Sequence, residues 1–206
     1  MKKEEQRPGF DLKMTAEEIN CLPIAAYEGP VHVVRTEDAL EKAVLALRRE
    51  TVLGFDTETK PNFTRGENHP LSLIQFAGSR AAYIIQLRHL QSCAPLLKLF
   101  SDERIIKAGV DIPQDIVKLQ ERLGGDYKNC VDVSLDAKAA GLKNFSLRGL
   151  AAVLLGVRIT KGMRVSNWGR DTLLPSQVKY AATDAWISRE LYLRLQQQEA
   201  FRIAHS

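Results

Sequence analysis

The chain has 206 residues, of which 45% are hydrophobic and 26% are charged. This length and composition fit one globular domain with a full hydrophobic core and leave little room for a second full domain. The formal charge of +4, from 29 basic and 25 acidic residues, is too small an excess to select a class of partner by itself.

The N-terminal residues predict an appendage to the main domain. Residues 1–14 mix charges with Pro and Gly, and Thr15 precedes Glu18 by three positions, which is the spacing of a capping box on a short helix. The N-terminus has no apolar signal-peptide region, and no other stretch is apolar for the length of a membrane span. We expect an appendage at residues 1–30, a main domain at 31–206, and a soluble cytoplasmic protein that does not enter a membrane.

Residues 31–87 predict strands with one helix between them. A short strand is expected at 31–36, and the helix that follows opens at Thr36 and repeats Leu40, Val44 and Leu47 at helical spacing. Three runs rich in β-forming residues follow at 51–58, 71–78 and 81–87. The turn residues at 78–80 predict that the last two runs pair as a hairpin.

Helices dominate the rest of the chain. They are expected at 93–102, 112–124, 131–141, 145–156 and 175–199, with a short strand at 104–110. Gly156 is a suitable helix C-cap, and residues 157–174 form a long basic loop. Early strands that include a hairpin, followed by helices, predict an α/β domain with a mixed sheet of five strands flanked by helices.

Two carboxylates, Asp56 and Glu58, end the apolar run at 51–58. Side chains two residues apart in a strand project from the same face, separated by about 7 Å along the chain, so the pair can share one ligand. The alternative is a strand end whose acids are simply in solvent, and a single D-x-E motif does not decide between the two.

Further candidates lie on the predicted helices. Tyr180 and Asp184 are four residues apart, hence on one helical face, among alanines that permit close approach to a neighbouring element. A surface pair is the alternative. Asp111 stands where a helix cap is expected and Asp115 one turn inside the helix, and spacing alone does not choose between these two acids.

The three segments "FDTE", "AGVDIPQDIVKL" and "YAATDA" together resemble, in order, the exonuclease motifs of the DEDD superfamily of 3'-to-5' exonucleases. The sequence looks like the tyrosine subtype, as in ribonuclease D and the exonuclease domain of the Werner-syndrome helicase, since the histidine subtype would have His where Lys179 stands. The resemblance covers about residues 31–199 and implies a ribonuclease H-like fold. It also implies the catalytic residues Asp56, Glu58, Asp115, Tyr180 and Asp184.

In such a site the four acids would be metal ligands, because four converging carboxylates repel one another and two divalent cations offset their charge. Ligation by oxygen alone favours Mg²⁺ or Mn²⁺. Two such cations can activate a water molecule and stabilise the leaving 3'-oxygen of a phosphodiester. Tyr180 is expected to orient that water, because a phenol is a poor base at neutral pH.

Substrate contacts are expected beside these acids and in the basic loop. Trp168 either stacks on a base or packs the loop onto the last helix. Lys60 and Arg65 lie in the loop after the first acids and either line the entry to the site or are only solvated. The candidate substrate-binding residues are Thr57, Thr59, Lys161, Arg164, Trp168 and Arg170.

The resemblance therefore predicts a hydrolase that shortens nucleic acids from single-stranded 3' ends, DNA or RNA, and releases nucleoside 5'-monophosphates. No obligate protein partner is evident from the sequence. One alternative is a catalytically silent nucleic-acid-binding protein on the same fold, which the loss of any of the four acids would favour; none is lost. Another is a nuclease for very short oligonucleotides.

Overall fold

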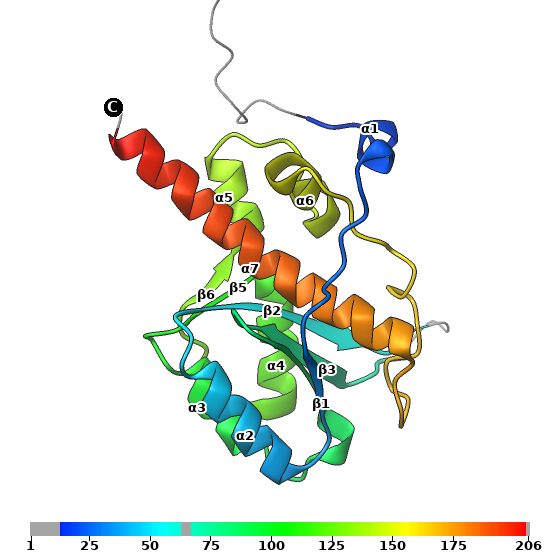
Figure 1. Ribbon diagram of the computed structural model, residues 1–206. Helices are drawn as coiled ribbons and strands as arrows, with labels where there is room; N and C mark the ends of the chain where they lie inside the picture. Colours follow the sequence, from blue (N-terminus) through cyan, green and yellow to red (C-terminus); the bar gives the residue numbers. More distant parts are fainter. Residues whose placement is uncertain (1–12, 63–66, 205–206) are drawn as a thin grey trace, which may run out of the picture.

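The computed structural model describes residues 13–62 and 67–204 and contains one sheet with helices on both faces (Figure 1). The strands of this described part are β1 (Val31–Val34), β2 (Val52–Thr59), β3 (Leu71–Ala77), β4 (Ala82–Gln86), β5 (Ile106–Gly109) and β6 (Cys130–Asp132). The helices are α1 (Ala16–Cys21), α2 (Glu37–Leu47), the 3-10 helix η1 (Leu87–His89), α3 (Ala94–Phe100), α4 (Ile112–Leu123), α5 (Val133–Ala139), α6 (Leu147–Leu155) and α7 (Pro175–Ala204).

The sheet is mixed, as the sequence predicts, with the strand order β1-β4-β3-β2-β5-β6. β3 and β4 form the predicted antiparallel hairpin, and β2 pairs antiparallel with β3. β2 pairs parallel with β5, so the carboxyl ends of these two strands meet at the same edge of the sheet. This edge receives the residues that follow each strand.

The predicted number of strands was too small, because the described residues form six and not five. The additional strand, β6, has only three residues and pairs parallel with β5. Its last two residues begin the segment 131–141, which the sequence assigns to a helix. Asp132 at the end of the strand already caps helix α5, because its carboxylate accepts a hydrogen bond from the backbone N–H of Ser134. A strand this short has no periodicity of its own and forms because the neighbouring edge of β5 is available.

Local signals in the sequence set most helix ends. The Thr15–Glu18 capping box is present at α1, and the Thr36 hydroxyl accepts the backbone N–H of Ala39 at the start of α2. Gly156 ends α6 in the left-handed conformation, with a φ of 68°. These confirmed ends fix where the chain enters α1 and α2 and where it leaves α6.

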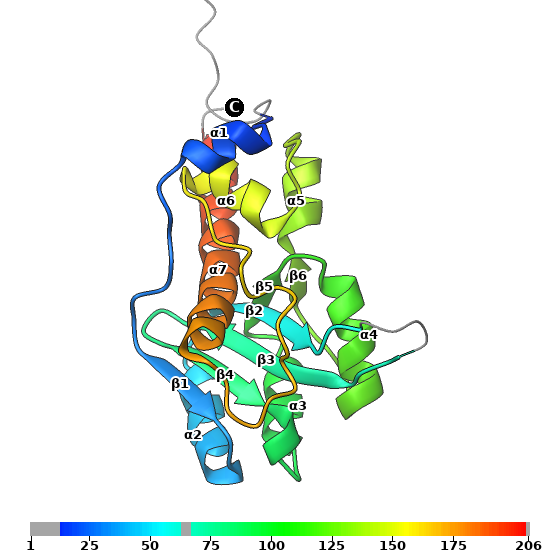
Figure 2. The same ribbon diagram turned by 90° about the vertical axis from the view of Figure 1, so that its right-hand side faces the viewer.

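The helices form two layers around the sheet. Figure 2, turned by 90° from Figure 1, shows α5, α6 and α7 on one side and α2, α3 and α4 on the other. On the side of α2–α4, the rings of Phe55, Phe76 and Phe100 pack together, with centroids 5.5–5.7 Å apart. On the other side, buried alanines of α7 lie against β3 and β4. Both faces of the sheet are therefore covered by apolar packing.

Helix α7 crosses β2 at very short range. Gly54 is the crossing point, because a Cβ atom placed on it would lie 1.8 Å from the carbonyl oxygen of Ala185. Ala181 and Ala185 are fully buried at this contact, as the alanine-rich sequence of the helix predicts. The small residues on both elements bring the backbone of α7 next to the strand that carries Asp56 and Glu58.

The described N-terminal residues are bonded to the main domain. The backbone of Arg158 exchanges hydrogen bonds with Pro23 and Ala25, and the backbone N–H of Tyr27 donates to the hydroxyl of Thr183 on α7 at 3.0 Å. The division of the chain at residue 30 stays a prediction, and residues 1–12 lie outside the described part. No helix within the described ranges is long and apolar enough to cross a lipid bilayer.

Candidate active site

Three carboxylates from two elements converge beside the crossing of α7 and β2. Asp56 and Glu58 lie on the same face of β2 as Gly54, and Asp184 lies on α7, one residue before Ala185. One oxygen from each of the three carboxylates lies within 4.8 Å of the others. The close approach at Gly54 thus places an acid of the last helix against the two acids of the strand.

Asp115 reaches the same region from the opposite layer of helices. It lies in the first turn of α4, which follows β5, and its carboxylate accepts a hydrogen bond of 2.5 Å from the hydroxyl of Thr57. Thr57 stands between Asp56 and Glu58 on β2, so this bond joins α4 to the strand that carries the other acids. Asp115 is buried, with 6% of its surface exposed.

Asp111, the competing acid in this segment, has a different environment. It is exposed at the N-cap position of α4, but its side chain makes no capping hydrogen bond. Its backbone adopts the left-handed conformation with a φ of 63°. The geometry therefore favours Asp115 over Asp111 as the acid of the candidate site. Asp111 occupies the expected N-cap position, but the expected capping hydrogen bond from its side chain is absent.

Burial raises the pKa values of all four acids when no cation is present. Burial is the largest cause at each of them, followed at Asp56 and Glu58 by the neighbouring carboxylates. The pKa of Asp56 is raised well above its usual value, that of Glu58 to about 10, that of Asp115 to about 6 and that of Asp184 to about 7. The site thus strongly favours positive charge.

Tyr180 lies one turn before Asp184 on α7, and its hydroxyl donates a hydrogen bond to that carboxylate. Burial and the nearby acids raise the pKa of the phenol well above its usual value. The hydroxyl therefore stays protonated at neutral pH, which suits a group that donates a hydrogen bond and orients a water molecule. It does not suit a general base.

The four acids fit divalent cations. One buried oxygen of Asp184, Oδ1, has no hydrogen-bond partner, although an unsatisfied buried acceptor is costly. The oxygens of Asp56, Glu58 and Asp184 are close enough to share an ion, and a set of carboxylate oxygens selects a hard cation. A metal site explains both the unpartnered oxygen and the concentration of like charge.

Two residues that were not among the predicted site residues also act on the acids. Gln75, fully buried on β3 opposite Asp56, donates a hydrogen bond from Nε2 to Asp56 Oδ2 at 3.3 Å. Lys118, one turn after Asp115 on α4, lowers the pKa of three of the acids by its charge. Sequence reasoning missed both, although Gln75 is a polar residue inside an apolar strand and Lys118 stands at helical spacing from Asp115.

The predicted substrate-binding residues are spread over different environments. The hydroxyl of Thr57 donates a hydrogen bond to Asp115, and Thr59 is half-buried at the end of β2. Lys161, Arg164 and Arg170 are exposed on the predicted loop. Trp168 is only 1% exposed, and its ring packs against that of Tyr180 with centroids 5.9 Å apart. This burial favours the packing alternative for Trp168 over base stacking, while Arg65 lies outside the described residues.

Comparison with known sequences finds similarity to 3'-5' exonucleases. A family model described as 3'-5' exonuclease matches residues 31–199. The mouse protein named exonuclease 3'-5' domain-containing protein 2 is 34% identical over 156 residues, which are 70% of this chain and 24% of that protein. The mouse bifunctional 3'-5' exonuclease/ATP-dependent helicase WRN is 30% identical over 150 residues, which are 70% of this chain and 11% of that protein. The chain thus spans a quarter or less of these two relatives.

Comparison with solved structures supports the fold. The exonuclease domain of Nibbler from Aedes aegypti has a TM-score of 0.78 at 25% identity, covering 86% of this chain and 93% of that chain. Escherichia coli ribonuclease D has a TM-score of 0.73 at 22% identity, covering 81% of this chain and 45% of that chain. The second likeness concerns the fold alone, and it confirms the expected ribonuclease H-like architecture.

Proposed function

This chain belongs to the 3'-5' exonuclease family, and from that membership we propose that it hydrolyses single-stranded nucleic acids from their 3' ends and releases nucleoside 5'-monophosphates. The observation that carries the proposal is the convergence of Asp56, Glu58 and Asp184 within 4.8 Å, on a domain whose family acts at 3' ends. Asp115 and Tyr180 stand where the motifs of the tyrosine subtype require them. No residue type of the motif set is missing.

We propose that Asp56, Glu58, Asp115 and Asp184 hold two divalent cations, Mg²⁺ or Mn²⁺. Cations in such a site supply an activated water and offset the charge that develops on the phosphodiester and on the leaving 3'-oxygen. The side chains of the protein orient these acids. Gln75 and Thr57 each donate a hydrogen bond to one of the acids, which fixes the direction of the other carboxylate oxygens.

Tyr180 has a separate role in this proposal. Its protonated hydroxyl would hold the attacking water in line with the scissile bond, and its ring is held in place by Trp168. The proton of that water would leave to solvent, because the raised pKa of the phenol removes Tyr180 as an acceptor. The exposed cations Lys161, Arg164 and Arg170 would contact phosphates of the strand, and Thr57 and Thr59 would contact the terminal nucleotide.

The experiment uses matched DNA and RNA oligonucleotides labelled at the 5' end. With Mg²⁺ or Mn²⁺ we expect a ladder that shortens stepwise from the 3' end, nucleoside 5'-monophosphate as the product, and no shortening in EDTA. A 3'-phosphorothioate end is the control, because it slows only cleavage that starts at that end. Binding of both strands without metal-dependent shortening would contradict the proposal and favour a silent binding protein. Shortening confined to the shortest oligonucleotides would identify a nuclease for such substrates.

A further inference from the structure

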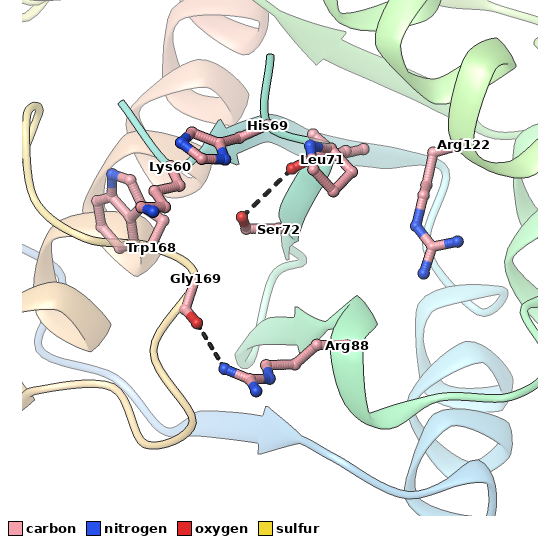
Figure 3. Close-up of a pocket in the computed structure, with 9 residues that line it drawn as sticks. Lys60, His69, Leu71, Ser72, Arg88, Arg122, Trp168 and Gly169 are labelled. Carbon is pink, nitrogen blue, oxygen red and sulfur yellow. Dashed lines mark hydrogen bonds between the residues drawn. The ribbon is translucent and has the colours of Figure 1, made fainter. Parts of the chain in front are cut away.

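A second surface feature adjoins the candidate active site. A cavity of about 300 Å³ lies between the end of β2, the start of β3 and the loop around Trp168 (Figure 3). Three cationic side chains from three different elements line it: Lys60 directly after β2, Arg88 in η1 and Arg122 in the last turn of α4. In Figure 3 they surround the opening from different sides. Among the described residues, no acid lines this cavity.

The positive charge of the cavity is largely uncompensated. Arg88 donates one hydrogen bond of 2.5 Å to the backbone carbonyl of Gly169, which leaves its charge without a carboxylate. Neither Lys60 nor Arg122 forms an ion pair within residues 13–62 and 67–204. His69 at the rim differs, because its Nε2 lies 3.4 Å from a carboxylate oxygen of Glu67. Three unpaired cations around one hollow repel one another, and an anion in the hollow would relieve that repulsion.

The cavity and the acid cluster share their supporting elements. Lys60 follows Glu58 by two residues at the end of β2, and Arg122 lies about 10 Å along α4 from Asp115 by the rise of a helix. Trp168 lines the cavity and also packs against Tyr180. A ligand bound at the acids therefore has this cavity beside it, within reach of the next groups of an extended chain.

We propose that this cavity binds the phosphate groups that lie on the 5' side of the scissile bond in a single strand. The inference rests on the proposed function, because it assumes that the terminal phosphodiester lies at the four acids. Arginine and lysine are the side chains that bind phosphate oxygens most strongly. The largely buried side chains of Trp168 and Leu71 form the apolar floor beneath these cations. Lys161, Arg164 and Arg170 do not line the cavity.

The first experiment measures binding without turnover. Every variant is made in an Asp184→Asn background in EDTA, and fluorescence anisotropy of a labelled single strand is followed over a range of KCl concentrations. Arg122→Ala should weaken binding several-fold at low salt and reduce the slope of log Kd against log salt by about 0.7 for each phosphate that the protein no longer binds. Lys60→Ala should act in the same direction, and Arg122→Lys should restore most of the slope. Neither side chain is buried, so the fold tolerates these changes.

Lys98→Ala is the matched control, because it removes the same charge from an exposed position on α3 outside the cavity. Unchanged affinity and salt slope in Arg122→Ala and Lys60→Ala, relative to Lys98→Ala, would overturn the proposal even if the exonuclease activity is present. A different result is possible if the wild-type protein never shortens a strand but the variants still show the expected decrease in salt slope. The cavity would then stay a binding site, and the proposed hydrolysis would be rejected.

The second experiment separates strand phosphates from free phosphate. A dinucleotide has only the scissile phosphate, whereas a tetranucleotide has further phosphates on its 5' side. In the otherwise native protein, Arg122→Ala should lower kcat/KM for the tetranucleotide by about tenfold more than for the dinucleotide, mainly through KM. Equal losses for both lengths would mean that the cavity does not hold the upstream strand.

Discussion

At the scale of single residues, the candidate site combines four acids whose burial as charged groups weakens the metal-free fold. Their pKa values are raised because burial disfavours the ionised form, and at Asp56 and Glu58 the neighbouring carboxylates of the cluster add to this effect. Proteins keep destabilising groups such as these four acids when ligand binding requires them, because the residues best suited to function are often not the most stabilising ones. The cost of these acids can therefore be measured as a change in the free energy of unfolding.

Asp184→Asn should stabilise the metal-free protein, because it removes one buried charge and keeps the shape of the side chain. In EDTA we expect the free energy of unfolding to rise by about 2 kcal/mol, measured by urea denaturation. The same variant should lose its hydrolytic activity and most of the stabilisation by Mn²⁺ that the wild-type protein shows. A variant less stable than wild type in EDTA would argue against the burial of this charge as the dominant effect.

The pH dependence of metal-free stability follows from the same shifts. The pKa values of Asp115 and Asp184, about 6 and about 7, lie above those of an unfolded chain, at about 4. Between these values the folded protein binds more protons than the unfolded one, so its stability falls as the pH rises from about 4 to about 7. We expect the melting temperature in EDTA to decrease over this window, with a shallower decrease in Asp184→Asn. A flat profile would contradict the raised pKa values.

Tyr180→Phe removes a hydroxyl and leaves the ring packed on Trp168. Because the proposed role is to orient water, kcat should fall by about 10² while the affinity for Mn²⁺, measured by titration calorimetry, stays within about twofold. The ring contact predicts that the melting temperature changes little. Full activity in the Phe variant would exclude the proposed role of the hydroxyl.

Asp111 and Asp115 should respond differently to substitution. Asp115→Ala should abolish activity, whereas Asp111→Ala should cost about 1 kcal/mol of stability through its left-handed backbone, since alanine tolerates a positive φ less well than Asp, Asn or Gly. Asp111→Gly is the matched control and should recover that stability, as measured by thermal unfolding. Loss of activity in Asp111→Gly would show that the second motif has been assigned to the wrong acid.

At the scale of secondary-structure elements, the crossing of β2 and α7 positions the site. The contact depends on Gly54, which has no side chain between the strand and the carbonyl of Ala185. It brings Asp184 next to Asp56 and Glu58. Asp115 lies on α4, in the layer of helices on the other face of the sheet. The distances between the acids are therefore set by how closely two elements pack.

Gly54→Ala should separate these elements, because the added Cβ would lie 1.8 Å from a backbone oxygen that cannot rotate away. We expect a loss of about 1–3 kcal/mol in unfolding free energy and a larger proportional loss of activity, as the acids move apart. Gly162→Ala is the matched control, because nothing lies within 4 Å of its added Cβ. Equal stability of the two variants would show that the crossing tolerates extra volume.

At the scale of the whole molecule, the sequence predicted the order of nearly all elements, and the family resemblance named the three acids that the structure brings together, Asp56, Glu58 and Asp184. Helix ends were predictable where a local residue sets them, as at Thr36 and Gly156. The hairpin was predictable because its turn is short. The family motifs supplied the remaining information, since the spacing of Asp56 and Glu58 alone does not reveal a third acid more than a hundred residues away.

Other features depend on packing that the sequence does not display. Strand β6 forms only because β5 offers a free edge, and the bond from Gln75 to Asp56 depends on the register of two strands. The basic cavity is lined by Lys60, Arg88 and Arg122 from separate elements, so no local sequence pattern predicts it. The burial of Trp168 is likewise a property of the loop as folded.

The position of α7 also determines when the candidate site is assembled as the chain is made. Synthesis proceeds from the N-terminus, so a chain still attached to the ribosome presents Asp56, Glu58 and Asp115 before Tyr180 and Asp184 exist. The cluster closes only when α7 has emerged and docked across β2. The three carboxylates that lie within 4.8 Å of one another are therefore brought together by the last helix of the described chain, at the end of folding and not at its start.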